Sequence, residues 1–242
     1  MENSATLDIL KELIKIPSYF EEKNNERNLG FFIMNYLKAN TDLQVDQQEV
    51  ENGRFNIIAY KNLEPKLILF GHLDTVPPKV ETLNPFSGEQ KGQKLYGLGS
   101  VDMKAGIATM LEIAKKYRKS DQIAYIFTVD EEYEFKGAHK IIEKYIFNPE
   151  YTINLEPTDL KILNGCRGVT EFSFLVHGKS SHAGTKHLGV NAIEKAVELS
   201  NLIQSEISEF DTTDSKNSFN LAYLNGGILS KDGNVMYSGN VV

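Results

Sequence analysis

Four short clusters of acidic and histidine residues stand where predicted strands end or a predicted helix begins. They are His72-Leu73-Asp74, the glycine-rich run from Gly97 to Gly106, the acidic run from Asp130 to Glu134, and Glu156-Pro157-Thr158. Imidazole nitrogens and carboxylate oxygens bind divalent cations, and a free carboxylate can take a proton from water. The carboxyl ends of parallel strands meet at one edge of an open sheet, so distant clusters can converge there. The four clusters are therefore candidates for a single metal site.

The first cluster directly follows an apolar run at residues 67–70. In an extended chain, side chains two residues apart point the same way. Asp74 can then lie beside the His72 imidazole and fix its tautomer, as carboxylates do behind metal-binding histidines. The alternative interpretation is an ordinary capped strand end without a metal.

The second cluster resembles a phosphate-binding loop but differs from it in two respects. Asp102 stands where the third glycine of a dinucleotide-binding motif belongs, and no Gly-Lys-Ser/Thr follows. An acidic side chain at that position repels phosphate. Two interpretations remain for Asp102: a plain helix N-cap, which the motif alone favours, or a carboxylate that binds a cation with both oxygens, where the flexible glycines let the backbone approach that cation.

The third cluster holds four acidic residues within five positions, directly after an apolar run at residues 123–129. Such residues repel one another unless water or a metal neutralises them. A solvated turn is the common explanation. With metal present, one glutamate can coordinate while its neighbour accepts a proton from water. Glu156 is a single carboxylate at a strand end and carries little weight alone.

Hydrophobic periodicity predicts the elements that position these clusters. We expect a helix capped by Ser4 and ended by Pro17, and a second helix that starts at Asn24 or Asn25. The remaining predictions for residues 1–165 are strands at 43–50, 55–60, 67–70, 123–129 and 151–155, a long loop at 74–100, and helices at 102–117 and 138–145. This alternation predicts an α/β domain with a mostly parallel sheet and helices on both faces.

After Gly165 the pattern changes. Strands are predicted at 169–176, 219–224, 227–229 and 235–238, with an amphipathic helix at 190–207. We therefore expect a second, smaller α+β domain at residues 166–242.

Composition excludes several functional classes. The formal net charge is −7, and no Lys/Arg-rich run is present, so neither nucleic acid nor an anionic membrane is an expected partner. Cys166 is the only cysteine, which rules out an intramolecular disulfide. The N-terminus lacks a signal-peptide pattern and no apolar run reaches bilayer length, so we expect a cytoplasmic protein.

Taken together in order and rough spacing, the four clusters resemble the co-catalytic zinc family of acetylornithine deacetylase, succinyl-diaminopimelate desuccinylase, aminoacylases, carboxypeptidases and dipeptidases. The resemblance extends from Ile16-Pro17-Ser18 to Ser181-His182-Ala183 and Gly189-Val190-Asn191, essentially the whole chain.

The resemblance implies a role for each matching residue. His72, Asp102 and Glu156 hold one zinc ion, while Asp102 and Glu132 hold the second. Asp74 orients His72, and Glu131 is the general base that activates water. The oxygen-rich ligand set also suits manganese or cobalt. His182 is implied to contact substrate in a partner subunit, within a homodimer formed by the small domain.

The implied fold is zinc-peptidase-like, with a small lid or dimerisation domain. A family member is expected to leave that domain after a strand near Asn240-Val241-Val242 and then to supply a final histidine ligand, so we expect a shortened chain with weak or no activity. Glu156-Pro157-Thr158 favours removal of an acetyl or succinyl group from an N-acyl amino acid. The alternatives are a metallodipeptidase or carboxypeptidase, and an inactive homologue that only dimerises.

Overall fold

A five-stranded sheet is the centre of the first of two units in the computed structural model, Met1–Gly165 and Cys166–Val242. Its strands are β1 (Gln44–Glu51), β2 (Arg54–Tyr60), β3 (Leu67–His72), β6 (Ile123–Thr128) and β7 (Tyr151–Asn154), in the order β1-β2-β6-β3-β7. The structure describes residues 3–22, 24–145, 147–211, 217–229 and 235–236.

The direction of the strands confirms the mostly parallel sheet. β3 pairs in parallel with β6 on one side and β7 on the other, whereas β2 is antiparallel to both β1 and β6. Only β2 therefore runs against the rest. The carboxyl ends of β3, β6 and β7 lie at the same edge, which places the residues that follow them near one another.

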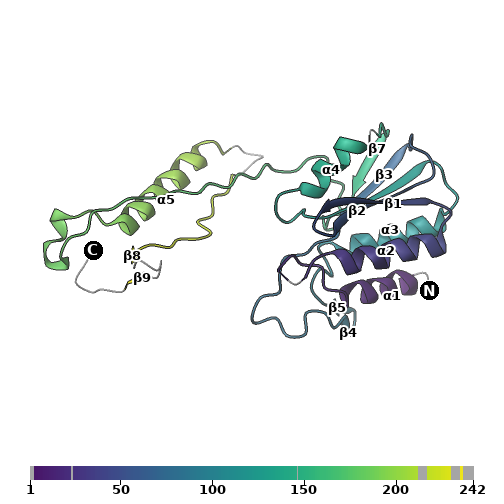
Figure 1. The fold of residues 1–242 in the computed structure, drawn as a ribbon, viewed down its shortest axis with the longest axis horizontal. Coiled ribbons are helices and arrows are strands. Elements are labelled where there is room, and N and C mark those ends of the chain that lie inside the picture. The colour runs from purple at the N-terminus through teal and green to yellow at the C-terminus, as the bar shows by residue number, and fades with distance from the viewer. Residues whose placement is uncertain (1–2, 23, 146, 212–216, 230–234, 237–242) are drawn as a thin grey trace. The chain divides into compact units, whose positions relative to one another are not determined.

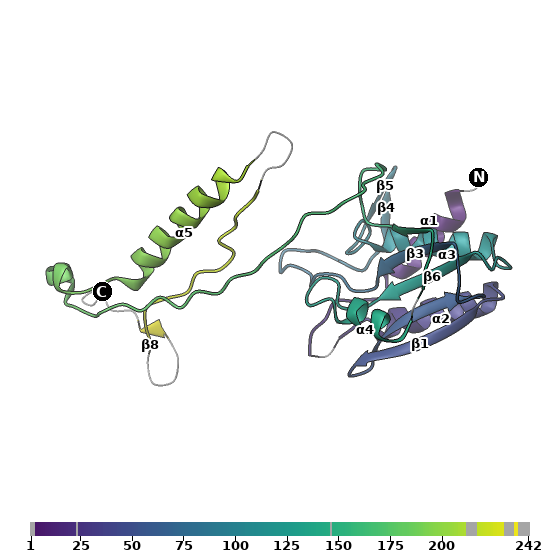
Figure 2. The same ribbon diagram turned by 90° about the horizontal axis from the view of Figure 1, so that it is seen from above.

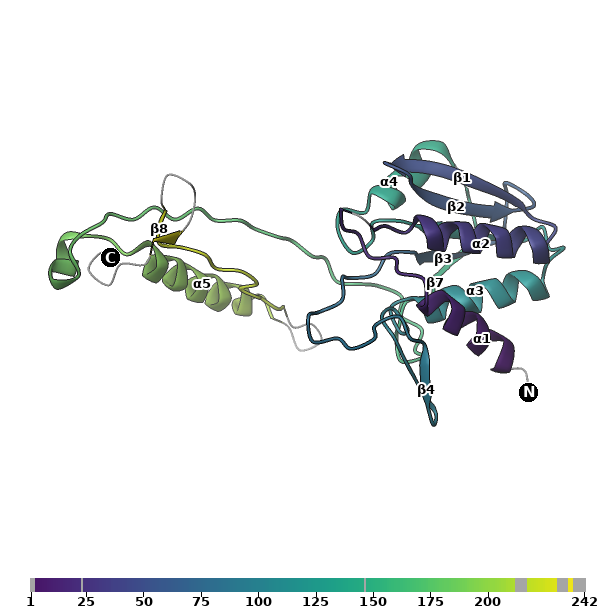
Figure 3. The ribbon, with the colours of Figure 1, turned by 60° about the horizontal axis from the view of Figure 1, so that its bottom comes forward.

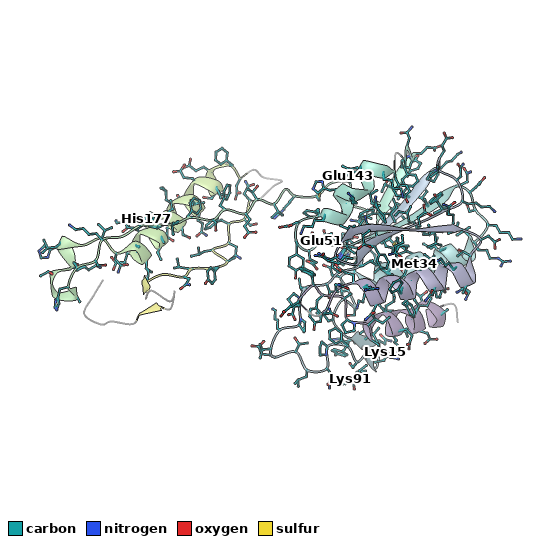
Figure 4. The ribbon with its side chains drawn as sticks, viewed as in Figure 1. Lys15, Met34, Glu51, Lys91, Glu143 and His177 are labelled. Atoms are coloured by element: carbon teal, nitrogen blue, oxygen red, sulfur yellow. The ribbon has the colours of Figure 1, made fainter. Side chains whose placement is uncertain are left out.

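Helices cover both faces of the sheet, as expected. α2 (Arg27–Asn40) and α3 (Lys104–Lys116) lie on one face, α1 (Asn3–Ile14) packs against α3, and α4 (Lys136–Lys144) lies on the opposite face (Figures 1 and 3). Met34, labelled in Figure 4, belongs to the buried stripe of α2. Each face has its own apolar core; the larger includes Leu13, Ile33 and Phe127, and the smaller includes Ile58, Ile126 and Ile141.

Several predicted boundaries differ from those observed. α1 begins at Asn3, so Ser4 lies within the helix and not before it. α2 begins at Arg27, whose backbone N–H donates to the side chain of Asn25. The predicted loop at 74–100 contains a small antiparallel hairpin formed by β4 (Glu89–Lys91) and β5 (Lys94–Tyr96). Its strands are short and largely polar, and they lack the apolar pattern that predicts a strand.

The second unit contains a 3₁₀-helix, η1 (Ala183–Leu188), the helix α5 (Ala192–Glu209), and a short antiparallel pair, β8 (Ile228–Leu229) and β9 (Val235–Met236). The helix prediction is confirmed, and Asn191 caps it by accepting two backbone N–H groups. The strands predicted at 169–176 and 219–224 are wrong, because these residues are extended alongside α5 without pairing to a described strand (Figure 2). Ser238 and the strand expected near Asn240 lie outside the described residues.

Among the described residues, no helix combines the length and apolar character that a bilayer crossing requires.

Candidate metal centre

His72 lies at the carboxyl end of β3, with its ring held on both sides. Its backbone N–H donates to Met103 Sδ at 3.1 Å, and its Nδ1 is 3.0 Å from the backbone carbonyl of Asp74. A carbonyl oxygen can only accept, so Nδ1 carries a proton and donates it. The side chain is 1% exposed, and Nε2 lies 3.1 Å from Asp102 Oδ1. The ring is therefore fixed with Nε2 directed at a carboxylate.

Three carboxylates from separate parts of the chain converge on His72 Nε2. The nearest oxygens of Asp102, Glu156 and Glu131 lie at 3.1, 3.6 and 3.8 Å. The residues His72, Asp102 and Glu156 each offer one ligand atom, and these three atoms lie within 4.8 Å of one another. This spacing lets a single divalent ion contact all three residues after small movements of the side chains.

Asp74 joins this group to the acidic turn that follows β6. Its fully buried carboxylate accepts the backbone N–H of Glu131 at 3.1 Å and that of Glu132 at 2.9 Å. The carboxylate also lies 3.5 Å from His72 Nδ1, which is closer to the Asp74 carbonyl. Asp74 thus contacts the imidazole through both its backbone carbonyl and its carboxylate. The shorter hydrogen bonds of the carboxylate are those to the backbone of the turn.

Glu132 lies in the same turn but is not one of the three residues that share a possible ion position. Burial, followed by the negative charges of Asp102 and Glu131, raises the pKa of Glu132, while His72 lowers it. The negative charges of Asp102 and Glu132 therefore disfavour each other's ionised forms.

Asp102 is not the N-cap of the following helix. Met103 occupies the cap position, and no side chain makes a capping hydrogen bond there. The Asp102 side chain is 53% exposed, and Oδ1 faces His72 instead. The peptide bond between Asp102 and Met103 is cis. The capping interpretation is therefore wrong, and the Asp102 carboxylate belongs to the His72 group.

The surroundings of His72 and Glu156 raise the pKa values of both residues strongly. Burial lowers the pKa of His72, but hydrogen bonds with Asp102 and Asp74 and the charges of Asp74 and Glu156 outweigh it and raise the pKa to about 11. Burial and the charges of Asp102 and Glu131 raise the pKa of Glu156 to about 7. The pKa of Glu131 is raised as well, first by burial. The site holds more carboxylates than His72 can neutralise, and this donor set fits a divalent cation.

Close packing around Met103 supports the site, and the sequence pattern did not predict it. Met103 is fully buried, and a Cβ on Gly71 would lie 2.7 Å from its Cε. A Cβ on Gly106 would overlap the backbone carbonyl of Leu155, immediately before Glu156. These glycines allow α3 to approach β3 and the end of β7 closely. A methionine and two glycines have no chemical signature of a metal site, so only the packing identifies them.

The remaining predicted site residue, His182, belongs to the second unit. Its exposed side chain precedes η1, and Nδ1 accepts the backbone N–H of Gly184 at 3.1 Å. This bond leaves Nε2 of His182 available for another partner.

Comparison with known proteins identifies relatives that are named as a deacetylase and a probable desuccinylase. The chain is 39% identical over 156 residues to acetylornithine deacetylase from Vibrio vulnificus, covering 62% of this chain and 41% of the relative. It is 29% identical over 235 residues to a probable succinyl-diaminopimelate desuccinylase from Staphylococcus aureus, covering 92% and 58%. The chain thus spans about half the length of these curated relatives.

Solved structures share the fold. A tripeptidase from Staphylococcus aureus superposes with a TM-score of 0.59 and 21% identity, covering 98% of this chain and 62% of that protein. A metallo-carboxypeptidase from Sulfolobus solfataricus gives a TM-score of 0.50 at 17% identity, covering 62% and 37%. The sequence pattern of peptidase family M20/M25/M40 matches residues 68–218. Because this match includes more than half of the chain, the chain belongs to that family.

Proposed function

We propose that this chain is a metal-dependent amide hydrolase that removes an acetyl or succinyl group from an N-acyl amino acid. The observation that carries the proposal is the convergence of His72, Asp102 and Glu156 within 4.8 Å, with Glu131 beside the same imidazole. The names of the curated relatives, a deacetylase and a probable desuccinylase, support the choice of an acyl group.

Two divalent ions are proposed for this site. His72, Asp102 and Glu156 would hold one, and Asp102 with Glu132 would hold the other; zinc is favoured by the imidazole, and cobalt or manganese by the carboxylates. When bound, such ions supply Lewis acidity that lowers the pKa of water and polarises an amide carbonyl.

Glu131 is the proposed general base. Its carboxylate oxygen lies 3.8 Å from His72 Nε2, and its backbone is held by Asp74. The raised pKa of Glu131 suits a group that must accept a proton from water and then donate it to the leaving amine near neutral pH. Asp74 contributes by fixing both the turn and the imidazole.

His182 is proposed to donate a hydrogen bond to the amide oxygen of substrate in a partner subunit. This role requires a homodimer, for which the second unit is the proposed interface. Light scattering on the purified chain measures its mass, and a strictly monomeric protein would remove His182 from the mechanism.

The test of the main proposal combines metal titration with a substrate panel. We expect the purified chain to bind zinc, cobalt or manganese in calorimetry. We expect any hydrolysis to be faster with N-acetylornithine or N-succinyl-diaminopimelate than with simple dipeptides. Glu131→Gln should retain metal binding and lose about 100-fold or more in kcat. Glu132→Gln should instead reduce the number of ions bound. Absence of metal binding by the unmodified chain would contradict the proposal, and faster dipeptide cleavage would replace the acyl substrate with a peptide.

A further inference from the structure

Arg54 is a buried cation at the first position of β2. It lies behind the acidic turn of residues 130–136, which follows β6. It is 1% exposed, and its guanidinium makes two hydrogen bonds to Glu26, at 2.9 and 2.6 Å. A third nitrogen, Nη1, lies 2.9 Å from Asp130 Oδ1. The ring of Phe20 covers the guanidinium, with its centroid 4.1 Å from Cζ. The fork of Arg54 is therefore fixed between α2 and the end of β6.

The partner of Arg54 in the turn, Asp130, organises the backbone that follows it. Its Oδ2 accepts the backbone N–H of Glu134 at 3.2 Å and that of Lys136 at 3.3 Å, and its carbonyl accepts the N–H of Phe135 at 2.7 Å. Asp130 is 2% exposed and has a φ of 68°, a left-handed conformation that aspartate and asparagine tolerate better than most residues. One carboxylate thus joins Arg54 to both ends of the turn.

Two further tethers define the part of the turn that Arg54 controls. Buried Asn56 accepts the N–H of Val129 at 3.1 Å and donates to the carbonyl of Gly137 at 2.8 Å, so the base of the turn is closed independently. Asp74 holds the backbone of Glu131 and Glu132 from the side of the metal centre. Arg54 therefore acts on the interior of the turn, between these two attachments.

We propose that Arg54 is a positioning residue for hydrolysis: through Asp130 it fixes the turn that presents Glu131 and Glu132 to the metal centre. The proposal rests on the proposed function for the roles of the two glutamates. Replacing a buried ion pair with apolar residues is often neutral for stability, so the network is better explained by the geometry it imposes. That geometry needs arginine, because its planar fork can bind Glu26 with two nitrogens and Asp130 with a third.

Two variants break the link at different points. Arg54→Lys keeps the positive charge but loses the fork. Asp130→Asn keeps the pair of Arg54 with Glu26 and tolerates the left-handed backbone, yet replaces one acceptor oxygen with a donor. Glu51→Gln is the control for charge. Glu51, labelled in Figure 4, lies 3.5 Å from Arg54 Nη1 and 3.1 Å from the Lys136 ammonium group, so this variant removes a neighbouring charge and leaves the contact of Arg54 with Asp130 in place.

Hydrogen exchange of the full chain without metal tests the hold on the turn directly. In both variants we expect the backbone N–H groups of residues 131–136 to exchange about tenfold faster or more, while β3 and β6 exchange as in the unmodified protein. Glu51→Gln should leave the exchange of residues 131–135 unchanged, since Glu51 contacts only the side chain of Lys136 in the turn. Unchanged exchange at 131–136 in both variants would overturn the proposal, as would an equal increase throughout the sheet, which indicates a purely structural role.

Metal binding and kinetics then test the consequence for the site. Arg54→Lys should retain the ion held by His72, Asp102 and Glu156, since none of these lies in the turn, and weaken the ion that involves Glu132. We expect kcat to fall about 100-fold with KM within about threefold, because the general base is misplaced while most substrate contacts remain. If both variants had the same kcat as the unmodified protein, this result would contradict the positioning role. If the unmodified chain binds no metal, the proposed function fails, whereas exchange still decides whether Arg54 fixes the turn.

Discussion

His72 shows how one side chain can be fixed for coordination before an ion arrives. The Asp74 carbonyl accepts a hydrogen bond from Nδ1, and Nε2 faces the carboxylates of Asp102 and Glu156. Without a cation, a proton on Nε2 neutralises part of the surrounding negative charge, which explains the pKa of about 11. An incoming ion must therefore displace a proton from His72.

Metal binding is predicted to release protons in a pH-dependent number. At pH 8, His72 with a pKa of about 11 is protonated, while Glu156 with a pKa of about 7 is mostly ionised, so about one proton should leave. At pH 6, Glu156 is also mostly protonated, and the number should approach about two. Zinc affinity should accordingly rise about tenfold per pH unit near pH 8. Calorimetry in buffers of different ionisation enthalpy measures the release, and a value near zero at both pH values would contradict it.

The residue types in the sequence point to side chains that can bind a metal, but they do not reveal side chains that act through packing. His72, Asp102 and Glu156 follow apolar runs or precede a helix, and the structure brings them together. Their roles, with those of Glu131 and Glu132, stay predictions. Met103 could not be predicted, because an apolar residue at a helix start is usually part of an ordinary core. Arg54 was missed for a related reason: the sequence does not reveal that an arginine is buried.

At the scale of elements, α3 is held close to the sheet where the site residues emerge. Gly106 of α3 faces the carbonyl of Leu155, and Met103 fills the space beside Gly71 of β3. Asp102 and Glu156 belong to the chain segments on either side of this contact. Their separation therefore depends on how closely the helix can approach the end of β7.

Gly106→Ala should move these segments apart. The added methyl group overlaps the Leu155 carbonyl, and overpacking of this kind costs about 1–3 kcal/mol in the free energy of unfolding. Zinc affinity should fall as well, because Glu156 follows Leu155 directly. Urea denaturation and metal titration measure the two effects. Gly168→Ala is the control, since a Cβ at Gly168 meets no atom within 4 Å. Equal results for the two variants would show that the approach of α3 is not critical.

A different polar cluster joins the neighbouring strands β1 and β2 to the chain after α4. Asp46 accepts hydrogen bonds from the hydroxyls of Tyr60 at 2.9 Å and Tyr145 at 3.0 Å, and from Gln44 at 2.9 Å. Burial raises the pKa of Asp46, but these hydrogen bonds and the charge of Lys144 lower it below the usual 3.8. The ionised carboxylate therefore stabilises the folded state.

Asp46→Asn should lower the free energy of unfolding by about 1–2 kcal/mol at pH 7. Because the folded-state pKa is depressed, this stabilisation is fully present above the unfolded pKa and is lost as the pH falls through the folded pKa. The difference between the two proteins should thus persist at pH 5 and shrink below pH 3.8. Urea denaturation across this range measures it. Tyr60→Phe, which removes one donor, should show a smaller loss with the same trend; a difference independent of pH would indicate a purely steric effect.

Strands that bury apolar residues could be predicted from the sequence. Strands that depend on pairing with a neighbouring strand could not. β3 and β6 come from continuous apolar runs buried on both faces of the sheet, and these predictions are confirmed. At residues 169–176 the alternation of apolar residues predicts a strand, yet Val169 and Leu175 are 93% and 83% exposed. A strand needs a neighbour to satisfy its backbone groups, and a local pattern cannot supply one.

The two units of the molecule differ in how much apolar surface they bury. Met1–Gly165 contains both apolar cores. By contrast, no side chain described between residues 166 and 227 is buried, including those of α5. Hydrophobic burial supplies most of the stability of a folded domain. The cooperative unfolding transition of the purified chain should therefore reflect the unfolding of the first unit.

A fragment of residues 1–165 should consequently unfold in urea with the same midpoint and slope as the full chain. The slope scales with the surface exposed on unfolding, so a second unit that unfolded cooperatively would raise it about one and a half times. Tyrosine fluorescence measures both proteins, since the chain has no tryptophan. The comparison is made at several protein concentrations, because self-association through the second unit would raise the midpoint of the full chain alone as concentration increases. A steeper slope without concentration dependence would instead mean that residues 166–242 form a stable core of their own.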